Sequence, residues 1–75
     1  MRTKLSLPRR GLHRLTPREI GVIKLIAAGL GTKEIASKLG ISEHTIESHR
    51  STILHKLDLR RATQLVRWAI EEGIA

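Results

Sequence analysis

Short polar side chains repeat along the segment between residues 42 and 57. If this segment is helical, its spacing places four of them on one face: His44, Ser48, Ser51 and His55. The opposite face carries Ile46, Ile53 and Leu57, which is the spacing of a buried apolar stripe. Hydroxyl and imidazole groups can hydrogen-bond base edges, and the DNA major groove admits a helix. The pattern fits a DNA-reading helix, or a helix whose polar face is only solvated.

Charged and hydroxyl side chains border this polar face. Glu47 and Arg50 lie on one side of it, and Thr45, Thr52 and Lys56 lie on the other. Cations and hydroxyls beside a base-reading face are suited to hold the phosphates that set the register of a protein on DNA.

The same residue types do not form a catalytic or metal site. Ser and His occur together with Asp58, but hydroxyls on a helix face without a pocket make no triad. His44, His49 and His55 are five and six residues apart, whereas two ligands on one helix face need i, i+4 spacing. The chain has no Cys. We therefore expect a protein that is not an enzyme and that has no metal and no cofactor.

Length and charge restrict the fold and the partners. Seventy-five residues, 40% of them hydrophobic, form one small domain with a single core and no pocket for a small-molecule ligand. No apolar run approaches the roughly 18 residues of a membrane span, and the N-terminus has no secretory signal. We expect a cytoplasmic protein without a membrane partner.

The net charge of +7 is concentrated at the N-terminus. Five of the 14 cations precede Leu15, without any acid, and the rest of the chain sets nine Lys/Arg against seven Asp/Glu. We interpret residues 1–14 as a flexible basic arm or linker, and residues 15–75 as the domain. Such an arm favours an anionic partner such as nucleic acid, although it is equally consistent with a solubilising linker.

Four helices are predicted from capping signals and apolar periodicity. The first follows Thr-Pro-Arg-Glu at residues 16–19, in which Thr16 caps and Glu19 reaches back from the third helical position. The second is expected to be capped by Thr32 and to end at Gly40, which can adopt the positive φ that a β-carbon resists. The third is expected to begin after Ser42, its cap, so that a Gly-Ile-Ser turn joins two helices into a helix-turn-helix.

The last helix, residues 62–72, carries apolar side chains on more than one side. Leu65 and Ala69 share a face, Val66 and Ile70 share one flank, and Trp68 lies on the other. A domain this small cannot cover every side of its terminal helix, so we expect part of this surface to be exposed or to bind a partner.

Taken together, these motifs resemble the LuxR-type helix-turn-helix, also called the NarL/FixJ or GerE type. The resemblance lies in LTPRE, GLGTKEIASKLGIS, HTIESHRSTILHKL and QLVRWAIEEGI, which together cover most of residues 15–74. It implies an all-α four-helix bundle that binds double-stranded DNA, as a homodimer at least on DNA. It also implies transcription regulation at the bacterial nucleoid, as the output domain of a response regulator or as a stand-alone regulator.

The resemblance implies roles for individual residues. Its base-reading positions correspond to Glu47, Ser48 and Ser51, to which the helix face adds His44 and His55. Its phosphate contacts correspond to Thr32, Lys33, Thr45, Arg50, Thr52 and Lys56. The N-terminus of the third helix adds Ser42 to these candidates. Its dimer contact corresponds to the last helix, with Val66, Trp68 and Ile70.

Four residues depart from the family pattern, namely Ile20, Gly21, Glu47 and Arg61, and two other functions compete with it. Glu47 stands where many members carry Lys, and Arg61 stands where a capping Asn or Ser is expected, so the fourth helix is expected to fray at its start. One competing interpretation is a sigma region-4-like promoter module. The other is a protein-interaction module that dimerises through the fourth helix. The LTPRE opening and the EEGI ending favour the LuxR type.

Overall fold

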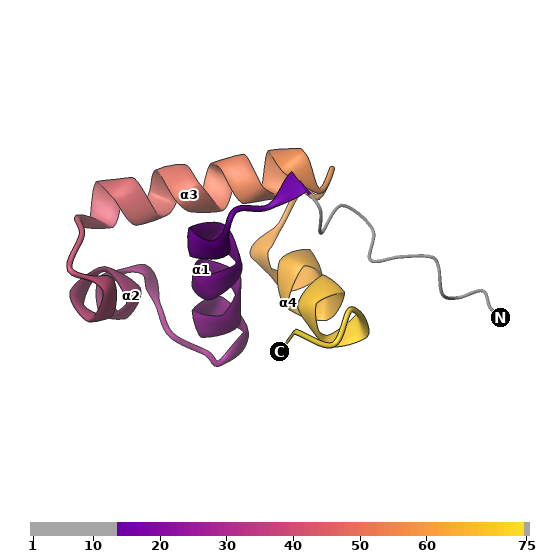
Figure 1. Ribbon diagram of the computed structural model, residues 1–75, viewed down its shortest axis with the longest axis horizontal. Coiled ribbons are helices and arrows are strands. Elements are labelled where there is room, and N and C mark those ends of the chain that lie inside the picture. Colours follow the sequence, from indigo (N-terminus) through magenta and orange to yellow (C-terminus); the bar gives the residue numbers. More distant parts are fainter. Residues whose placement is uncertain (1–13, 75) are drawn as a thin grey trace, which may run out of the picture.

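The computed structural model describes residues 14–74, which form four α-helices (Figure 1). Their bounds are α1 Pro17–Ala27, α2 Thr32–Leu39, α3 Glu43–Lys56 and α4 Ala62–Glu71. No strand occurs among these residues, so the predicted all-α four-helix class is confirmed. All but the last residue of the predicted basic arm lies outside the described residues.

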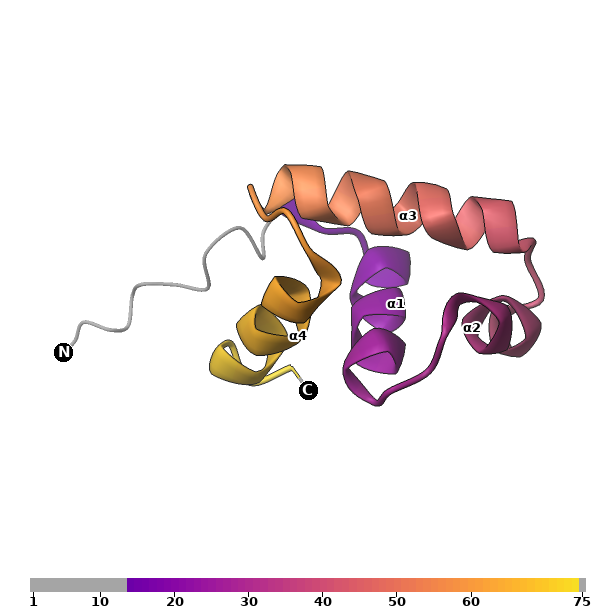
Figure 2. The same cartoon turned by 180° about the vertical axis from the view of Figure 1, so that it is seen from behind.

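The helix α3 is the longest and runs along one side of the molecule, with α1, α2 and α4 all on its other side (Figures 1 and 2). The central helix is α1, which packs against each of the other three, and α2 packs closely against α3. One side of α3 is therefore buried by the bundle, while no other helix covers its opposite side.

The start of α1 has the predicted capping box. The backbone N–H of Glu19 donates to Thr16 Oγ1 at 3.1 Å, and the N–H of Thr16 donates to Glu19 Oε1 at 2.9 Å. Pro17 occupies the first helical position, where its missing N–H costs no hydrogen bond.

The cap of α2 differs from the prediction. Gly31, not Thr32, is the N-cap residue, and Thr32 is the first residue of the helix. The carboxylate of Glu34 accepts from the N–H of Gly31 at 2.8 Å, so the first turn is closed from within the helix. The hydroxyl of Thr32 is thereby left for a contact outside α2. At the other end, Gly40 has a φ of 71°, as predicted.

The remaining two helices begin in different ways. Ser42 caps α3 as predicted, because its Oγ accepts from the N–H of Thr45 at 3.0 Å. At α4 the side chain of Arg61 makes no capping bond. Instead, Gln64 Oε1 accepts from the N–H of Arg60 at 2.7 Å and from that of Arg61 at 3.0 Å. This amide holds the residues just before α4, whereas no side chain caps the first-turn N–H groups of the helix.

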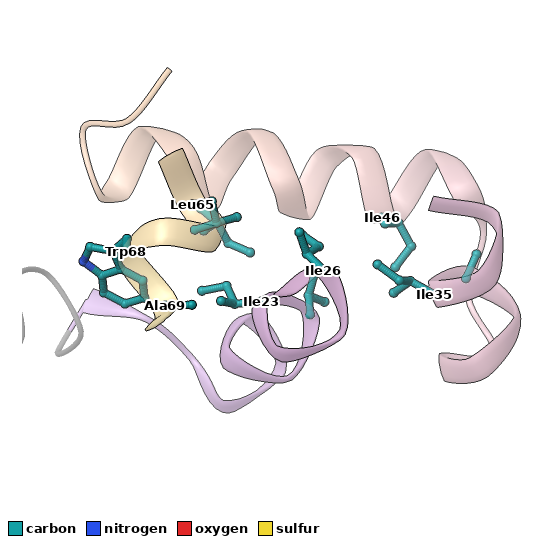
Figure 3. Packing of buried hydrophobic residues seen from close by; sticks show 10 residues of the cluster. Ile23, Ile26, Ile35, Ile46, Leu65, Trp68 and Ala69 are labelled. Carbon is teal, nitrogen blue, oxygen red and sulfur yellow. The ribbon is translucent and has the colours of Figure 1, made fainter. Parts of the chain in front are cut away.

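Ten buried apolar side chains from all four helices form one core, which extends from Trp68 at one end to Ile35 at the other (Figure 3). The burial of Trp68, which is 3% exposed, corrects its predicted place in a dimer contact. Its indole packs within the bundle and offers almost no surface to a partner. Ile70 on the same helix is 63% exposed, so α4 does present an apolar side chain to solvent, as predicted.

Two glycines allow a matched test of backbone conformation. A β-carbon added at Gly21, inside α1, or at Gly40 meets no atom within 4 Å, so crowding is absent at both. We expect Gly21→Ala to raise the free energy of unfolding by about 0.5–1 kcal/mol, because Ala favours a helix interior. We expect Gly40→Ala to lower it by about 1–2 kcal/mol, because Gly40 is left-handed. Urea unfolding followed by circular dichroism measures both, and equal effects would contradict the assignment of Gly40.

Candidate nucleic-acid interface

The predicted base-reading side chains all lie on the exposed side of α3. His44, Ser48, Ser51 and His55 are exposed, as is Glu47 beside them. The inner side of the same helix is anchored by Ile46 and Ile53, both fully buried. The structure therefore brings the predicted residues together on one surface, which we call the α3 outer face. Whether this face contacts bases stays a prediction.

A hydrogen-bonded chain connects this face to the start of α2. Thr32 Oγ1 donates to Glu47 Oε2 at 2.6 Å, and Arg50 Nη2 donates to Thr32 Oγ1 at 3.2 Å. Thr32 thus lies between the acid and the guanidinium and contacts both. The sequence placed Thr32 and Arg50 at phosphates and suggested that Glu47 could pair with Arg50, but it gave no sign that Thr32 contacts either of them.

The guanidinium of Arg50 has unused hydrogen-bonding capacity. Its Nε is buried and has no hydrogen-bond partner, the one such side-chain atom within residues 14–74. Arg50 as a whole is half-buried, and its Nη2 is held by the hydroxyl of Thr32. An arginine held in this way is suited to a phosphate oxygen, because its fork of donors is already oriented.

Lys56 makes a different contact from the one expected of it. Its Nζ donates to both carboxylate oxygens of Glu19, at 2.8 and 2.9 Å. The Glu19 side chain is only 6% exposed and that of Lys56 is 30% exposed. Because a buried carboxylate needs a cation, the charge of Lys56 is already neutralised within the fold. Its predicted phosphate contact would have to compete with this ion pair.

The Glu19–Lys56 pair joins the start of α1 to the end of α3. Arg14 adds a second link at the same end, because its Nη1 donates to the backbone oxygen of Lys56 at 3.2 Å. A cation at this position also interacts favourably with the carbonyl end of the helix dipole. Arg14, assigned to the arm by its charge, therefore contacts the folded domain.

The pKa of Glu19 lies below its ordinary value of 4.5. Burial, the largest single influence, raises this pKa, but the hydrogen bonds from Lys56 and Thr16 and the positive charge of Lys56 together outweigh it. A depressed folded-state pKa means that the ionised carboxylate stabilises the fold above the unfolded-state pKa. That contribution is lost as the pH falls through the folded-state pKa.

The other predicted phosphate residues lie at the helix N-termini or on the surface. Lys33 is exposed in the first turn of α2. Ser42 and Thr45 share a hydrogen bond of 2.8 Å between their hydroxyls at the start of α3, and Thr52 is exposed further along this helix. These residues are accessible, and their contact with phosphate stays a prediction.

No helix within residues 14–74 is long and apolar enough to cross a membrane. That part of the chain also has no cluster of three or more His, Asp or Glu side chains that could hold a metal ion.

Comparison with known proteins identifies a family and several relatives. The family described as "Bacterial regulatory proteins, luxR family" matches residues 13–69. Transcriptional regulatory protein MctR of Rhizobium johnstonii is 44% identical over 64 residues, which cover 85% of this chain and 30% of that protein. Oxygen regulatory protein NreC of Staphylococcus haemolyticus is 43% identical over 60 residues, which cover 80% of this chain and 28% of that protein. NreC of Staphylococcus carnosus matches to the same extent. The chain thus spans less than a third of the length of these relatives.

The Glu19–Lys56 pair predicts an acid-sensitive stability. We expect Lys56→Met, which keeps the aliphatic part of the side chain and removes the charge, to lower the free energy of unfolding by about 2 kcal/mol at neutral pH. The reason is that the buried carboxylate of Glu19 loses its cation. The deficit should shrink as the pH falls below 4.5 and Glu19 becomes protonated. Urea unfolding of both proteins, from neutral pH to below pH 4.5, measures this deficit.

Arg67→Met serves as the control, because it breaks an exposed pair in which Arg67 Nε lies 3.6 Å from Glu71 Oε2. Exposed pairs contribute little, so we expect almost no change in stability. A deficit for Lys56→Met that persists unchanged at low pH would show that Glu19 is not its origin.

Proposed function

This chain belongs to the luxR family of bacterial regulatory proteins, and on that premise we propose how its helices divide the work of binding DNA. The chain is a DNA-binding helix-turn-helix domain of a transcription regulator. We propose that α3 enters the major groove with its outer face toward the base edges, and that α2 lies across the phosphate backbone.

The observation that carries this proposal is the uncovered polar side of α3. Ser48 and Ser51, with His44 and His55, form a continuous exposed strip opposite the buried isoleucines. Short hydrogen-bonding side chains let a helix approach base edges closely, and the major groove is wide enough to admit it. A strip of Leu or Val in the same place would instead have favoured a protein partner.

Phosphate contacts are assigned to the residues around this strip. The N-cap of α2 is Gly31, which has no side chain to accept from the first-turn N–H groups, so these donors remain for an anion. Lys33 adds a cation in the same turn, and Arg50 adds a half-buried guanidinium whose Nη2 is held by Thr32. Ser42, Thr45 and Thr52 are the further candidates. These contacts position the protein, while the α3 outer face reads sequence.

We further propose that the domain acts on DNA as a homodimer through α4. Ile70 is 63% exposed, whereas Val66 is half-buried one turn earlier. An exposed isoleucine on a terminal helix is suited to a symmetric contact between two copies. Such a dimer would bind two half-sites about 34 Å apart, one turn of the double helix. Discrimination by serines is weak in one copy, so pairing of half-sites would add to specificity.

The role of the whole protein is also a proposal. NreC is described as an oxygen regulatory protein and MctR as a transcriptional regulatory protein, and both are more than three times as long as the matched region. We propose that the chain is the output domain of such a regulator, that it works in the cytoplasm at the nucleoid, and that this domain itself catalyses no reaction and binds no small molecule. Gel shifts with random and palindromic duplexes at two salt concentrations test the DNA-binding role directly.

The phosphate assignment predicts a salt effect for Lys33. We expect Lys33→Ala to weaken binding to all duplexes alike and to lower the slope of log affinity against log salt by about one, since one fewer counterion is released. Lys38→Ala is the matched control, because Lys38 is exposed in the last turn of the same helix. Equal slope changes in both variants would argue against a local contact at Lys33.

The dimer assignment predicts an effect that depends on the number of half-sites. We expect Ile70→Glu to weaken binding to a duplex with two half-sites by about tenfold or more, because a charge replaces an apolar contact. Binding to a duplex with a single half-site should be unchanged, which provides the internal control. Equal losses on both duplexes would place the defect in the DNA contact or in the fold.

A further inference from the structure

The carboxylate of Glu47 is held in place by a residue from another helix. Its Oε2 accepts the Thr32 hydroxyl at 2.6 Å, and Thr32 Oγ1 in turn accepts from Arg50 Nη2 at 3.2 Å. A threonine hydroxyl has a single hydrogen, and here it is directed at Glu47. The hydroxyl of Thr32 therefore has no hydrogen left for a DNA phosphate.

Glu47 is nevertheless exposed, next to Ser48 on the α3 outer face. Only one of its two carboxylate oxygens is bonded to Thr32, and each carboxylate oxygen can accept more than one hydrogen bond. The group is thus an oriented acceptor at the edge of the predicted reading surface. A free glutamate would lose rotamer freedom on contact with DNA, whereas this one has already lost much of it in the fold.

An acceptor-only group discriminates among the bases in the major groove. Guanine presents the acceptors N7 and O6, and thymine presents the acceptor O4, all of which repel a carboxylate. Cytosine presents the N4 amine as a donor. Adenine also presents an amine, but its acceptor N7 lies next to it and repels the second carboxylate oxygen. Cytosine is therefore the base that a fixed carboxylate accepts best.

We propose that Glu47 determines specificity for a C·G base pair in each half-site, and that Thr32 is the positioning residue that holds it. The inference rests on the proposed function, because it requires α3 to lie in the major groove. It adds the kind of base pair that the site selects. It also gives two neighbouring residues of α2 different roles, because Lys33 contacts the DNA phosphate backbone while Thr32 orients the side chain of Glu47.

The experiment is a selection of binding sites from duplexes randomised over two half-sites, carried out with the whole 75-residue chain and its variants. We expect the wild type to enrich one C·G pair per half-site. Glu47→Gln should replace it with an A·T pair at the same position, because glutamine pairs with adenine N6 and N7. The other enriched positions should stay unchanged. Glu43→Gln, which removes the same charge from an exposed residue in the first turn of α3, should leave the selected sequence as it was.

Variants of Thr32 test the positioning role. Replacing the selected C·G pair should cost the wild type about tenfold in affinity. In Thr32→Val, which removes the hydroxyl and keeps the shape, this penalty should fall to about twofold or threefold. Thr32→Ser should restore it, because the hydroxyl returns. Circular dichroism of each variant checks that the helices are intact.

The possible outcomes separate the inference from the function on which it rests. If Glu47→Gln selects the same sequence as the wild type, Glu47 does not read a base and the inference is wrong. If it binds every duplex more tightly by the same factor, Glu47 only opposes the phosphates, which also overturns the inference. In both cases sequence-specific binding, and with it the proposed function, survives. If the wild type selects no sequence at all and binds no duplex, the proposed function itself fails.

Discussion

Burial of two isoleucines on α3 determines which side of that helix faces outward. Ile46 and Ile53 are both fully buried, and each contributes about 1.5–3 kcal/mol when its side chain leaves water. Rotating α3 by one residue, about 100°, would expose them and bring polar neighbours into the core without hydrogen-bond partners. The outward direction of Ser48 and Ser51 is therefore a consequence of the core. The proposed functional surface is the part of α3 that the other three helices leave uncovered.

Apolar packing restricts this rotation but has no directional preference of its own, so polar contacts complete the positioning. Near one end of α3, Glu47 accepts the hydroxyl of Thr32 from α2, and at the other end Lys56 is paired with Glu19 of α1. Hydrogen bonds have narrow ranges of distance and angle, and charge-assisted ones are the stronger kind. Because Glu47 and Lys56 lie about two and a half turns apart along α3, the two contacts oppose both sliding and rotation of the helix against its neighbours.

The sequence was informative wherever the signal was local. Thr16 with Glu19, and Ser42 with Thr45, are only three residues apart, and the turn at Gly40 depends on that residue alone, so each could be identified from spacing and residue type. The contacts that matter most for the site join residues 15 and 37 positions apart, and no periodicity indicates such pairs. The correction for Trp68 has the same origin. With apolar residues on several sides of α4, only the packing of α1 against that helix decides which of them is buried.

The charges of α3 limit what this helix can contribute to affinity. Within Glu43–Lys56 two acids, Glu43 and Glu47, balance two cations, Arg50 and Lys56, so its formal charge is zero with neutral histidines. The charge of Lys56 is moreover neutralised by Glu19. The whole excess of +7 therefore lies outside the helix that is proposed to read bases. Since phosphate neutralisation supplies most of the sequence-independent binding energy, Arg50 is the main source of it on α3, and the rest must come from elsewhere in the chain, such as Lys33. A nearly neutral reading helix gains little from arbitrary DNA, so its contribution depends on matching hydrogen-bond donors and acceptors.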